Sequence, residues 1–199
     1  MKPGKPALIL ASGSPRRMEL LRAAGYRPRV FVPDVDENPK RGERPVALVR
    51  RLSLAKARAV AARLSGASVK GRQRVLAADT IVVIGDEILN KPVNRADAVR
   101  MIRKLAGRWH EVFSGYAILH LENGREVRAV NKVVRTRVKI RRMGPKDIAQ
   151  YLAMGESMDK AGAYAAQGAG MALIEEIWGS YTNVVGLPLA QVKADLERG

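Results

Sequence analysis

The step from a strand to a helix that decides the fold stands near the start of the chain, in residues 7–17, ALILASGSPRR. The apolar run over 7–11 is typical of a buried strand. Ser14 and Pro15 then favour the N-cap and the first turn of a helix, and Gly25 follows where that helix is expected to end. The stretch therefore predicts a β-α unit at the beginning of an α/β protein.

The rest of the chain continues this alternation and then becomes richer in strands. Periodicity and end signals predict helices over 45–64, 94–106, 145–152 and 188–197, and strands over 26–32, 75–84 and 171–177. Asn123 and Gly124 predict the tight turn of a hairpin between strands 112–121 and 126–140. Residues 155–170 are rich in Gly and Ala and show no steady period. The length of 199 residues suits one domain or two small lobes that share a cleft.

The composition excludes several classes of protein. Apolar residues make up 47% of the chain, which argues against wholesale disorder. There is no cysteine, so disulfides, thiolate nucleophiles and Cys-ligated zinc are excluded, and a reducing, cytoplasmic location is favoured. Two histidines are too few for a metal site built from imidazoles. No apolar stretch approaches the roughly 18–20 residues of a membrane span, so we expect no membrane partner.

The charge of the chain is strongly positive, with 36 Lys and Arg against 19 Asp and Glu and a formal net charge of +17. Such an excess indicates either a nucleic-acid surface or a protein that handles polyanionic small molecules. Many basic residues, among them Arg51 and Arg137, fall on faces that pattern as solvated. Aromatic residues make up only 5% and are not interleaved with the basic runs in the sequence, which argues against nucleic acid as a partner.

The loop from Ser12 to Arg17 is the first candidate site. A loop of small residues that leads into a helix presents free backbone N–H groups and the positive end of the helix dipole. Arg16 adds planar donors that suit phosphate. The pattern favours a bound anion here, and the alternative is a well-capped helix with an exposed pair of arginines.

Three charged residues outside that loop are further candidates. Asp79, which Thr80 follows, lies within the most apolar strand, so its carboxylate must be at a strand end, paired, or bound to a cation such as Mg²⁺. Lys56 stands in the middle of an apolar helix stripe, where it either reaches to the surface or binds phosphate. Glu37 belongs to a scarce acidic stretch, 34–37, which either supplies a second metal carboxylate or is a solvated loop.

The segment 155–168 offers polar groups among small residues. Its glycines permit a ligand to approach the backbone closely. Gln167 carries both a donor and an acceptor, as reading the edge of a base requires, and Asp159 and Lys160 add charge. The alternative is a tight connector that binds nothing.

Several familiar motifs are absent from the sequence. It contains no P-loop, no dinucleotide fingerprint and no HExxH zinc motif, and no Cys or Ser/His/Asp set supports covalent catalysis. The phosphate-binding groups and carboxylates that remain suit metal-assisted attack of water on a phosphate.

Short motifs that run in order from residue 8 to about 190 resemble those of the Maf (septum formation inhibitor) family. They are LASGSPRR at 10–17, ADT at 78–80, KP at 91–92, LAG at 105–107, DKAGAY at 159–164 with QG at 167–168, and VGLP at 185–188. The resemblance implies an ITPase-like α/β fold over residues 1–199, in which helices flank an elongated mixed sheet and a deep cleft separates two lobes.

The resemblance also implies a function, that of a nucleoside triphosphate pyrophosphatase. In such enzymes water attacks the α-phosphorus, the products are the nucleoside monophosphate and pyrophosphate, and a divalent metal, Mg²⁺ or Mn²⁺, is required. Gln167 and Gly168 are similar to the branch of the family that acts on dTTP and UTP. A homodimer is implied as well.

The same resemblance implies roles for individual residues. Asp79 matches the proton acceptor. Positions associated with substrate selection are matched by Arg16, Thr80 and Gln167, and polar residues that line the cleft are matched by Glu37, Lys56, Lys91 and Lys160. From the residues themselves we expect Asp79 and Glu37 to supply the carboxylates for the metal, and Ser12 to bind substrate with these cleft residues.

Two alternatives stay open at this point. The same hydrolysis could act on 7-methyl-GTP or on a modified purine triphosphate. In a different class, the chain could be a basic nucleic-acid-binding or cell-division regulatory protein without essential catalysis.

Overall fold

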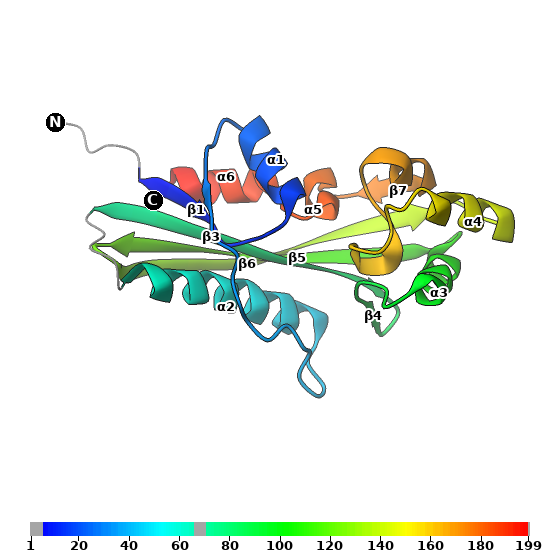
Figure 1. The fold of residues 1–199 in the computed structure, drawn as a ribbon, viewed down its shortest axis with the longest axis horizontal. Helices are drawn as coiled ribbons and strands as arrows, with labels where there is room; N and C mark the ends of the chain where they lie inside the picture. Colours follow the sequence, from blue (N-terminus) through cyan, green and yellow to red (C-terminus); the bar gives the residue numbers. More distant parts are fainter. Residues whose placement is uncertain (1–5, 66–70, 199) are drawn as a thin grey trace. The chain divides into compact units, whose positions relative to one another are not determined.

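A mixed sheet of seven strands with helices around it forms the part of the chain that the computed structural model describes, residues 6–65 and 71–198 (Figure 1). The strands follow the order β2 (Arg29–Val30), β1 (Ala7–Leu10), β3 (Arg72–Ile84), β5 (Trp109–Glu122), β6 (Arg125–Ile140) and β7 (Ile174–Trp178), and β4 (Glu87–Leu89) pairs with β3. β1 is parallel to β2 and β3, whereas β4 is antiparallel to β3 and β7 is antiparallel to β6. The predicted α/β class with a mixed sheet is confirmed.

Among the described residues, five α-helices begin within one residue of the predicted start, whereas the helix Tyr181–Val185 and both 3-10 helices are not predicted from the sequence. The helices are α1 (Pro15–Ala23), α2 (Pro45–Ser65), α3 (Arg95–Leu105), α4 (Pro145–Ala153), α5 (Tyr181–Val185) and α6 (Leu189–Glu197), with the 3-10 helices η1 (Ala161–Ala163) and η2 (Gly168–Leu173). α1, α2 and α4 each begin with a proline, which lacks the N–H that the first turn of a helix leaves unpaired. At α3 the side chain of Asn94 accepts a hydrogen bond from the N–H of Asp97 at 2.9 Å.

The chain folds into two compact units. The first comprises Met1–Asp79, Ser114–Val133 and Gly186–Gly199, and the second comprises Thr80–Phe113 and Val134–Val185. β3, β5 and β6 each contribute residues to both units. Each unit has its own hydrophobic core.

In the first unit α2 covers one face of the sheet, and α1 and α6 lie on the other face (Figure 1). The core under α2 includes Val60 of the helix and Val75 and Ala77 of β3. Side chains alternate between the two faces of a strand. Asp79, two residues after Ala77, therefore lies on the face that α2 covers.

In the second unit the core lies among α3, α4 and the strands. Met101 and Ile102 of α3 and Ile148 and Leu152 of α4 are buried in one cluster with Val138 of β6. The apolar residues of both helices recur at helical spacing, which gives each helix one inward face.

Two predicted strands are shorter in the structure than in the prediction. The strand predicted over 26–32 is reduced to Arg29–Val30. Pro28 precedes it directly, and Pro33 follows three residues after its end. Proline has no N–H to give to a sheet, so it restricts a strand in this way. The strand predicted over 171–177 begins only at Ile174, because η2 occupies the preceding residues.

One basic residue of β6 departs from the predicted solvated face. The guanidinium carbon of Arg137 lies 4.9 Å from the ring centroid of Trp109 and 5.0 Å from that of Trp178. Both distances are within the range of cation–π attraction. Two aromatic side chains therefore contact this basic residue in space, although aromatic and basic residues are not interleaved along the sequence.

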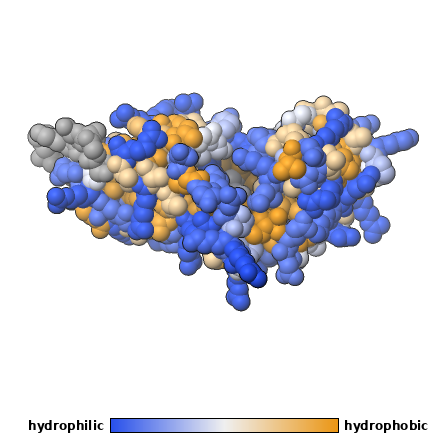
Figure 2. All heavy atoms as spheres, turned by 60° about the horizontal axis from the view of Figure 1, so that its bottom comes forward, coloured by the Kyte–Doolittle hydropathy of each residue, from blue (hydrophilic) through white to orange (hydrophobic). Residues whose placement is uncertain are grey.

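Other basic residues of β6 have acidic partners. Arg135 lies 3.1 Å from Glu111, and Lys139 lies 2.7 Å from Glu175. Hydrophilic residues cover most of the face in Figure 2, with hydrophobic residues in smaller groups between them. Among the described residues, no helix is long and apolar enough to cross a membrane.

The backbones of α2 and β5 approach each other at Gly115. A Cβ at this position would lie 2.1 Å from the carbonyl oxygen of Val49. Such a distance is far below van der Waals contact. A side chain at position 115 would therefore force α2 to move away from the sheet.

We predict that Gly115→Ala lowers the free energy of unfolding by at least about 1–3 kcal/mol, because the added methyl group overpacks the contact with α2. Urea unfolding followed by circular dichroism measures the change. Gly144→Ala is the control, since a Cβ there meets its nearest atom, Oδ2 of Asp147, at 3.6 Å. Equal stability of the two variants would contradict this account of α2 packing.

Candidate functional site

Asp79 of β3 and Lys56 of α2 form a buried ion pair in the first unit. Lys56 Nζ donates to Asp79 Oδ1 at 2.7 Å, and the two residues are 6% and 7% exposed. An isolated carboxylate in so apolar a strand would lose its hydration without compensation. The ammonium of Lys56 offsets that loss, so the structure shows Asp79 as a paired carboxylate and Lys56 as a buried lysine.

Glu37 joins this pair from the loop between β2 and α2. Lys56 Nζ lies 2.7 Å from Glu37 Oε2, and the side chain of Glu37 is 59% exposed. Arg51 of α2 ties the loop to the helix: its Nε donates to Glu43 Oε1 at 2.7 Å and its Nη2 donates to the carbonyl of Asn38 at 3.0 Å. The hydrogen bond from Arg51 lowers the pKa of Glu43 to about 2. The prediction that Arg51 is merely solvated is therefore wrong.

The Ser12–Arg17 loop is organised around a buried hydroxyl. Ser12 Oγ accepts hydrogen bonds from the N–H of Ser14 at 3.2 Å and from Arg17 Nη1 at 3.0 Å. Arg17 Nε also donates to the carbonyl of Gly186 at 2.9 Å, which joins this loop to the segment before α6. Arg16, the next residue back along the chain, is half-buried at the start of α1.

Electrostatics connect Arg17 to the carboxylates. Burial lowers the pKa of Arg17, while the negative charge of Asp79 acts in the opposite direction. The charges of Arg16 and Glu37 act on the same guanidinium. Ser12, Arg16, Glu37, Lys56 and Asp79 therefore belong to one charged neighbourhood within the first unit.

The carboxylates of Asp79 and Glu37 fit the donor set that a hard divalent cation prefers. Mg²⁺ is usually bound through one or two carboxylates together with phosphates of the substrate. Two carboxylates against the single ammonium of Lys56 leave this trio with a net negative charge. Among the described residues, no group of three or more His, Cys, Asp and Glu side chains could hold a metal by itself. The residues therefore fit a cation that shares its ligands with a substrate.

The remaining predicted site residues lie in the second unit. Thr80 follows Asp79 directly in β3 and is half-buried. Lys91 is exposed after β4, and Lys160 is half-buried before η1, where its Nζ donates to Asp159 Oδ1 at 2.5 Å. The residues beside these two lysines are joined across the chain by a hydrogen bond of 3.2 Å from the N–H of Gly162 to the carbonyl of Asn90.

Gln167 stands at the N-terminal end of η2, on a segment that two tyrosines hold in place. The hydroxyl oxygen of Tyr151 accepts a hydrogen bond from the N–H of Ala165 at 3.0 Å. The hydroxyl of Tyr181 donates to the carbonyl of Ala166 at 2.7 Å. The backbone just before Gln167 is thus fixed from two sides, and the side chain of Gln167 is half-buried.

The carboxylate of Glu156 holds the other side of the same segment. Its two oxygens accept hydrogen bonds from the N–H groups of Ala169 and Gly170, each at 3.3 Å. A Cβ at Gly170 would lie 2.2 Å from the carbonyl oxygen of Ala165, so the segment folds closely on itself. The Gly- and Ala-rich sequence therefore forms a compact, fixed loop.

Sequence reasoning missed three residues that position the candidate site. Arg17 belongs to the loop motif, but the sequence pattern points to Arg16 as the anion ligand, although a position three residues after Ser14 is within reach of the N-terminal turn. Glu156 and Arg51 lacked any local signal, because each acts on backbone or side chains of a loop whose path the sequence does not show.

A strand-borne carboxylate paired with a helix lysine, beside a small-residue loop that leads into a helix, defines a candidate anion-handling site on an α/β fold. The family model described as Maf-like protein matches residues 7–199. The chain therefore belongs to the Maf family, and the resemblance noted in the sequence is confirmed.

Several relatives are similar over nearly their full length, and each is named dTTP/UTP pyrophosphatase. The protein of Geobacter sulfurreducens is 48% identical over 194 residues, which cover 98% of this chain and 97% of that protein. The protein of Dictyoglomus thermophilum is 44% identical over 195 residues, with 98% and 96% covered. The protein of Symbiobacterium thermophilum is 48% identical over 182 residues, with 92% and 88% covered.

We predict that Lys56→Met lowers the free energy of unfolding by about 3 kcal/mol, because it leaves the buried carboxylate of Asp79 without its partner. Lys193→Met is the control: Lys193 lies 3.8 Å from Glu197, both side chains are more than half exposed, and the expected change is below about 0.5 kcal/mol. Urea unfolding measures both values. Similar losses in the two variants would show that the pair of Lys56 and Asp79 has no special role in stability.

Proposed function

We propose that this protein is a nucleoside triphosphate pyrophosphatase that hydrolyses dTTP and UTP to the nucleoside monophosphate and pyrophosphate. The observation that carries the proposal is the trio in which Lys56 Nζ lies 2.7 Å from a carboxylate oxygen of both Asp79, which is buried, and Glu37, which is exposed. These contacts support Asp79 as the base and Asp79 and Glu37 as the carboxylates for a metal ion. The names of the relatives support the choice of nucleotide.

A divalent cation, Mg²⁺ or Mn²⁺, is part of the proposal, and Asp79 and Glu37 would hold it. When bound, such an ion would polarise the phosphate and lower the pKa of the attacking water. The other steps belong to the chain. Asp79 accepts the proton of the water, as a positioned carboxylate does in general base catalysis.

Cationic side chains bind the triphosphate in this proposal. Arg16 offers planar donors next to the N-terminal end of α1, where the helix dipole also favours an anion. Lys56, Lys91 and Lys160 supply point charges that suit phosphate oxygens. Because Lys56 contacts both carboxylates, it holds them in place before the substrate binds.

The remaining candidate residues select and orient the substrate. Gln167 reads the pyrimidine edge with its amide donor and acceptor, on a segment that Tyr151, Tyr181 and Glu156 hold in place. Thr80 offers a hydroxyl beside Asp79. Ser12 keeps the phosphate loop in shape through its hydrogen bond with Arg17 and binds substrate through the loop.

We further propose a cytoplasmic location, which the absence of cysteine supports. A homodimer and a link to septum formation are supported by the family resemblance alone.

We predict that Asp79→Asn lowers kcat for dTTP by about 10²–10⁴-fold, the usual contribution of a positioned general base, while the protein stays folded. Pyrophosphate release in the presence of Mg²⁺ measures the turnover. Asp195→Asn is a matched control, because Asp195 is a buried carboxylate of the same unit that accepts hydrogen bonds from Tyr116 and Lys132. Its kcat should stay near that of the unchanged protein. Near-normal hydrolysis of dTTP by Asp79→Asn would refute the role of Asp79.

We predict that Gln167→Glu lowers the ratio of kcat/KM for dTTP over GTP by about tenfold or more. The new carboxylate has no donor, so the acceptor of the pyrimidine that the amide of Gln167 would bind is left without a partner. Gln191→Glu, on the exposed side of α6, is the control and should not change the ratio. The panel also contains UTP and 7-methyl-GTP. An unchanged ratio in Gln167→Glu would remove Gln167 from base selection, and a preference of the unchanged protein for 7-methyl-GTP would overturn the pyrimidine assignment.

A further inference from the structure

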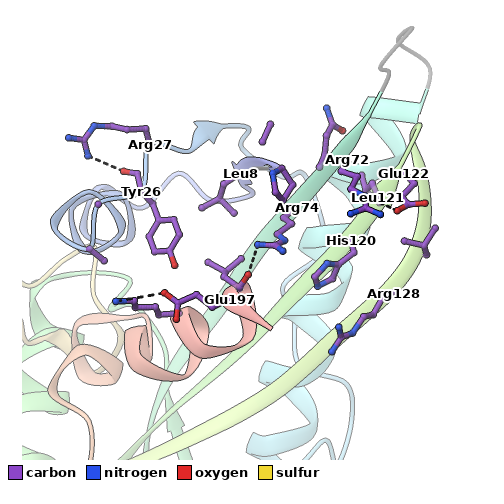
Figure 3. Close-up of a pocket in the computed structure, with 18 residues that line it drawn as sticks. Leu8, Tyr26, Arg27, Arg72, Arg74, His120, Leu121, Glu122, Arg128 and Glu197 are labelled. Atoms are coloured by element: carbon purple, nitrogen blue, oxygen red, sulfur yellow. Dashed lines mark hydrogen bonds and ion pairs between the residues drawn. The ribbon is translucent and has the colours of Figure 1, made fainter. Parts of the chain in front are cut away.

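A cavity of about 940 Å³ lies in the first unit, apart from the candidate catalytic residues (Figure 3). The starts of β1, β3 and β6, the end of β5, the turn after α1 and the last turns of α6 line it. Arg74 of its wall precedes Asp79 by five residues of β3, which corresponds to about 16 Å along a strand. None of the residues that line the cavity was assigned to the triphosphate site.

The charged side chains that line this cavity are mostly basic. Five cations stand against two carboxylates, an excess of three positive charges; they are Arg27, Arg72, Arg74, Arg128 and Lys193 against Glu122 and Glu197. Arg72 Nε lies 3.0 Å from Glu122 Oε1, and Lys193 Nζ lies 3.8 Å from Glu197 Oε1. Both carboxylates therefore already have a basic partner. Arg74 Nη1 also donates to the carbonyl of Leu196. The lining as a whole carries net positive charge, which attracts an anion.

His120 of β5 lies at the centre of the basic wall, between the side chains of Arg74 and Arg128 (Figure 3). Burial lowers the pKa of His120, and the positive charges of Arg74 and Arg128 lower it further. The Nε2 atom of His120 is buried and has no hydrogen-bond partner among the described residues. A buried polar atom without a partner costs free energy, which a bound ligand would recover.

The rest of the wall is apolar and aromatic. Leu8, Leu121 and Leu196 line the cavity together with Tyr26. The volume is within the ~300–1,000 Å³ that is typical of sites for small organic ligands, and it is far larger than inorganic phosphate requires. The wall thus suits a molecule with an anionic part and a larger, flat or apolar part.

We infer that this cavity is a second binding site of the protein, which takes an organic phosphate of the size of a mononucleotide. The phosphate lies against Arg74, Arg128 and His120, and guanidinium groups bind phosphate oxygens through paired donors. The organic part lies against Tyr26 and the leucines. The site goes beyond the proposed hydrolysis, because its residues carry no role in that reaction.

The two histidines of the chain make the site directly observable. His120 is at the cavity, whereas His110 belongs to the second unit, where burial lowers its pKa to about 3. Proton NMR of the imidazole Hε1 signals therefore gives one reporter and one internal control. The full-length protein is titrated at constant pH, in separate series, with dTMP, GMP, inorganic phosphate and a short single-stranded oligonucleotide. These probes are not triphosphates, so the result does not depend on the proposed hydrolysis.

We expect dTMP or GMP to shift the His120 signal in a saturable way while the His110 signal stays in place. Arg128→Glu should weaken that affinity about tenfold, the usual effect of losing a charge-assisted hydrogen bond. Arg125→Glu is the matched control, since Arg125 is an exposed residue of the same strand outside the cavity lining, and it should leave the affinity unchanged.

Four outcomes would overturn the inference. The first is that about 10 mM nucleotide, which fills even a weak site, causes no saturable shift of the His120 signal. The second is that Arg128→Glu binds the nucleotides as tightly as the unchanged protein, and the third is that inorganic phosphate binds as tightly as the nucleotides. The fourth is that the oligonucleotide alone shifts the His120 signal. The last of these would instead indicate a nucleic-acid surface. Loss of turnover in Asp79→Asn, or its absence, does not affect any of these measurements.

Discussion

The ion pair between Lys56 and Asp79 is the interaction on which the first unit and its candidate chemistry depend. Asp79 lies among buried apolar residues of β3, 75–78 before it and 81–83 after it, and its charge is stabilised there by a cation at 2.7 Å. The pair therefore fixes how α2 lies on β3. The close approach of Gly115 to the carbonyl of Val49 fixes the same helix further along, so α2 has little freedom to shift.

The same pair also shapes the proposed reaction. Desolvation costs free energy for stability, yet it strengthens every electrostatic interaction of the carboxylate with a substrate or a metal ion. The carboxylates of Asp79 and Glu37 are opposed by the positive charges of Lys56, Arg16 and Arg17, so charges of both signs are close together when no triphosphate is present. A site of this kind is preorganised: its charged groups are already in place before the substrate brings its own charge.

Helix starts and the hairpin turn could be predicted from the sequence, because they depend on single residues. Contacts between distant residues could not, because they depend on how the elements pack. The helix starts at Pro15 and at Asn94 and the hairpin turn at Asn123 follow from the backbone preferences of single residues. The short β2 also has a local cause, the prolines at positions 28 and 33, whereas β7 begins late because η2 occupies the residues before it. For the site, the sequence identified both members of the pair as charged residues in apolar surroundings, but their contact requires that α2 cover the odd-numbered side chains of β3. The contact of Arg137 with two tryptophans joins residues 28 and 41 positions away in sequence, and no local pattern encodes it.

Arg51 shows how the candidate site can depend on a residue that is not proposed to bind the substrate. It lies five residues before Lys56 on the same helix and holds the loop that carries Glu37 through Glu43 and the carbonyl of Asn38. The rotation of α2 and the position of the loop are therefore coupled, because Arg51 connects the helix to the loop. In a survey of random variants, substitutions of Arg51 would lower activity in the same way as substitutions of Glu37. A map drawn from activity alone would therefore place Arg51 in the active site.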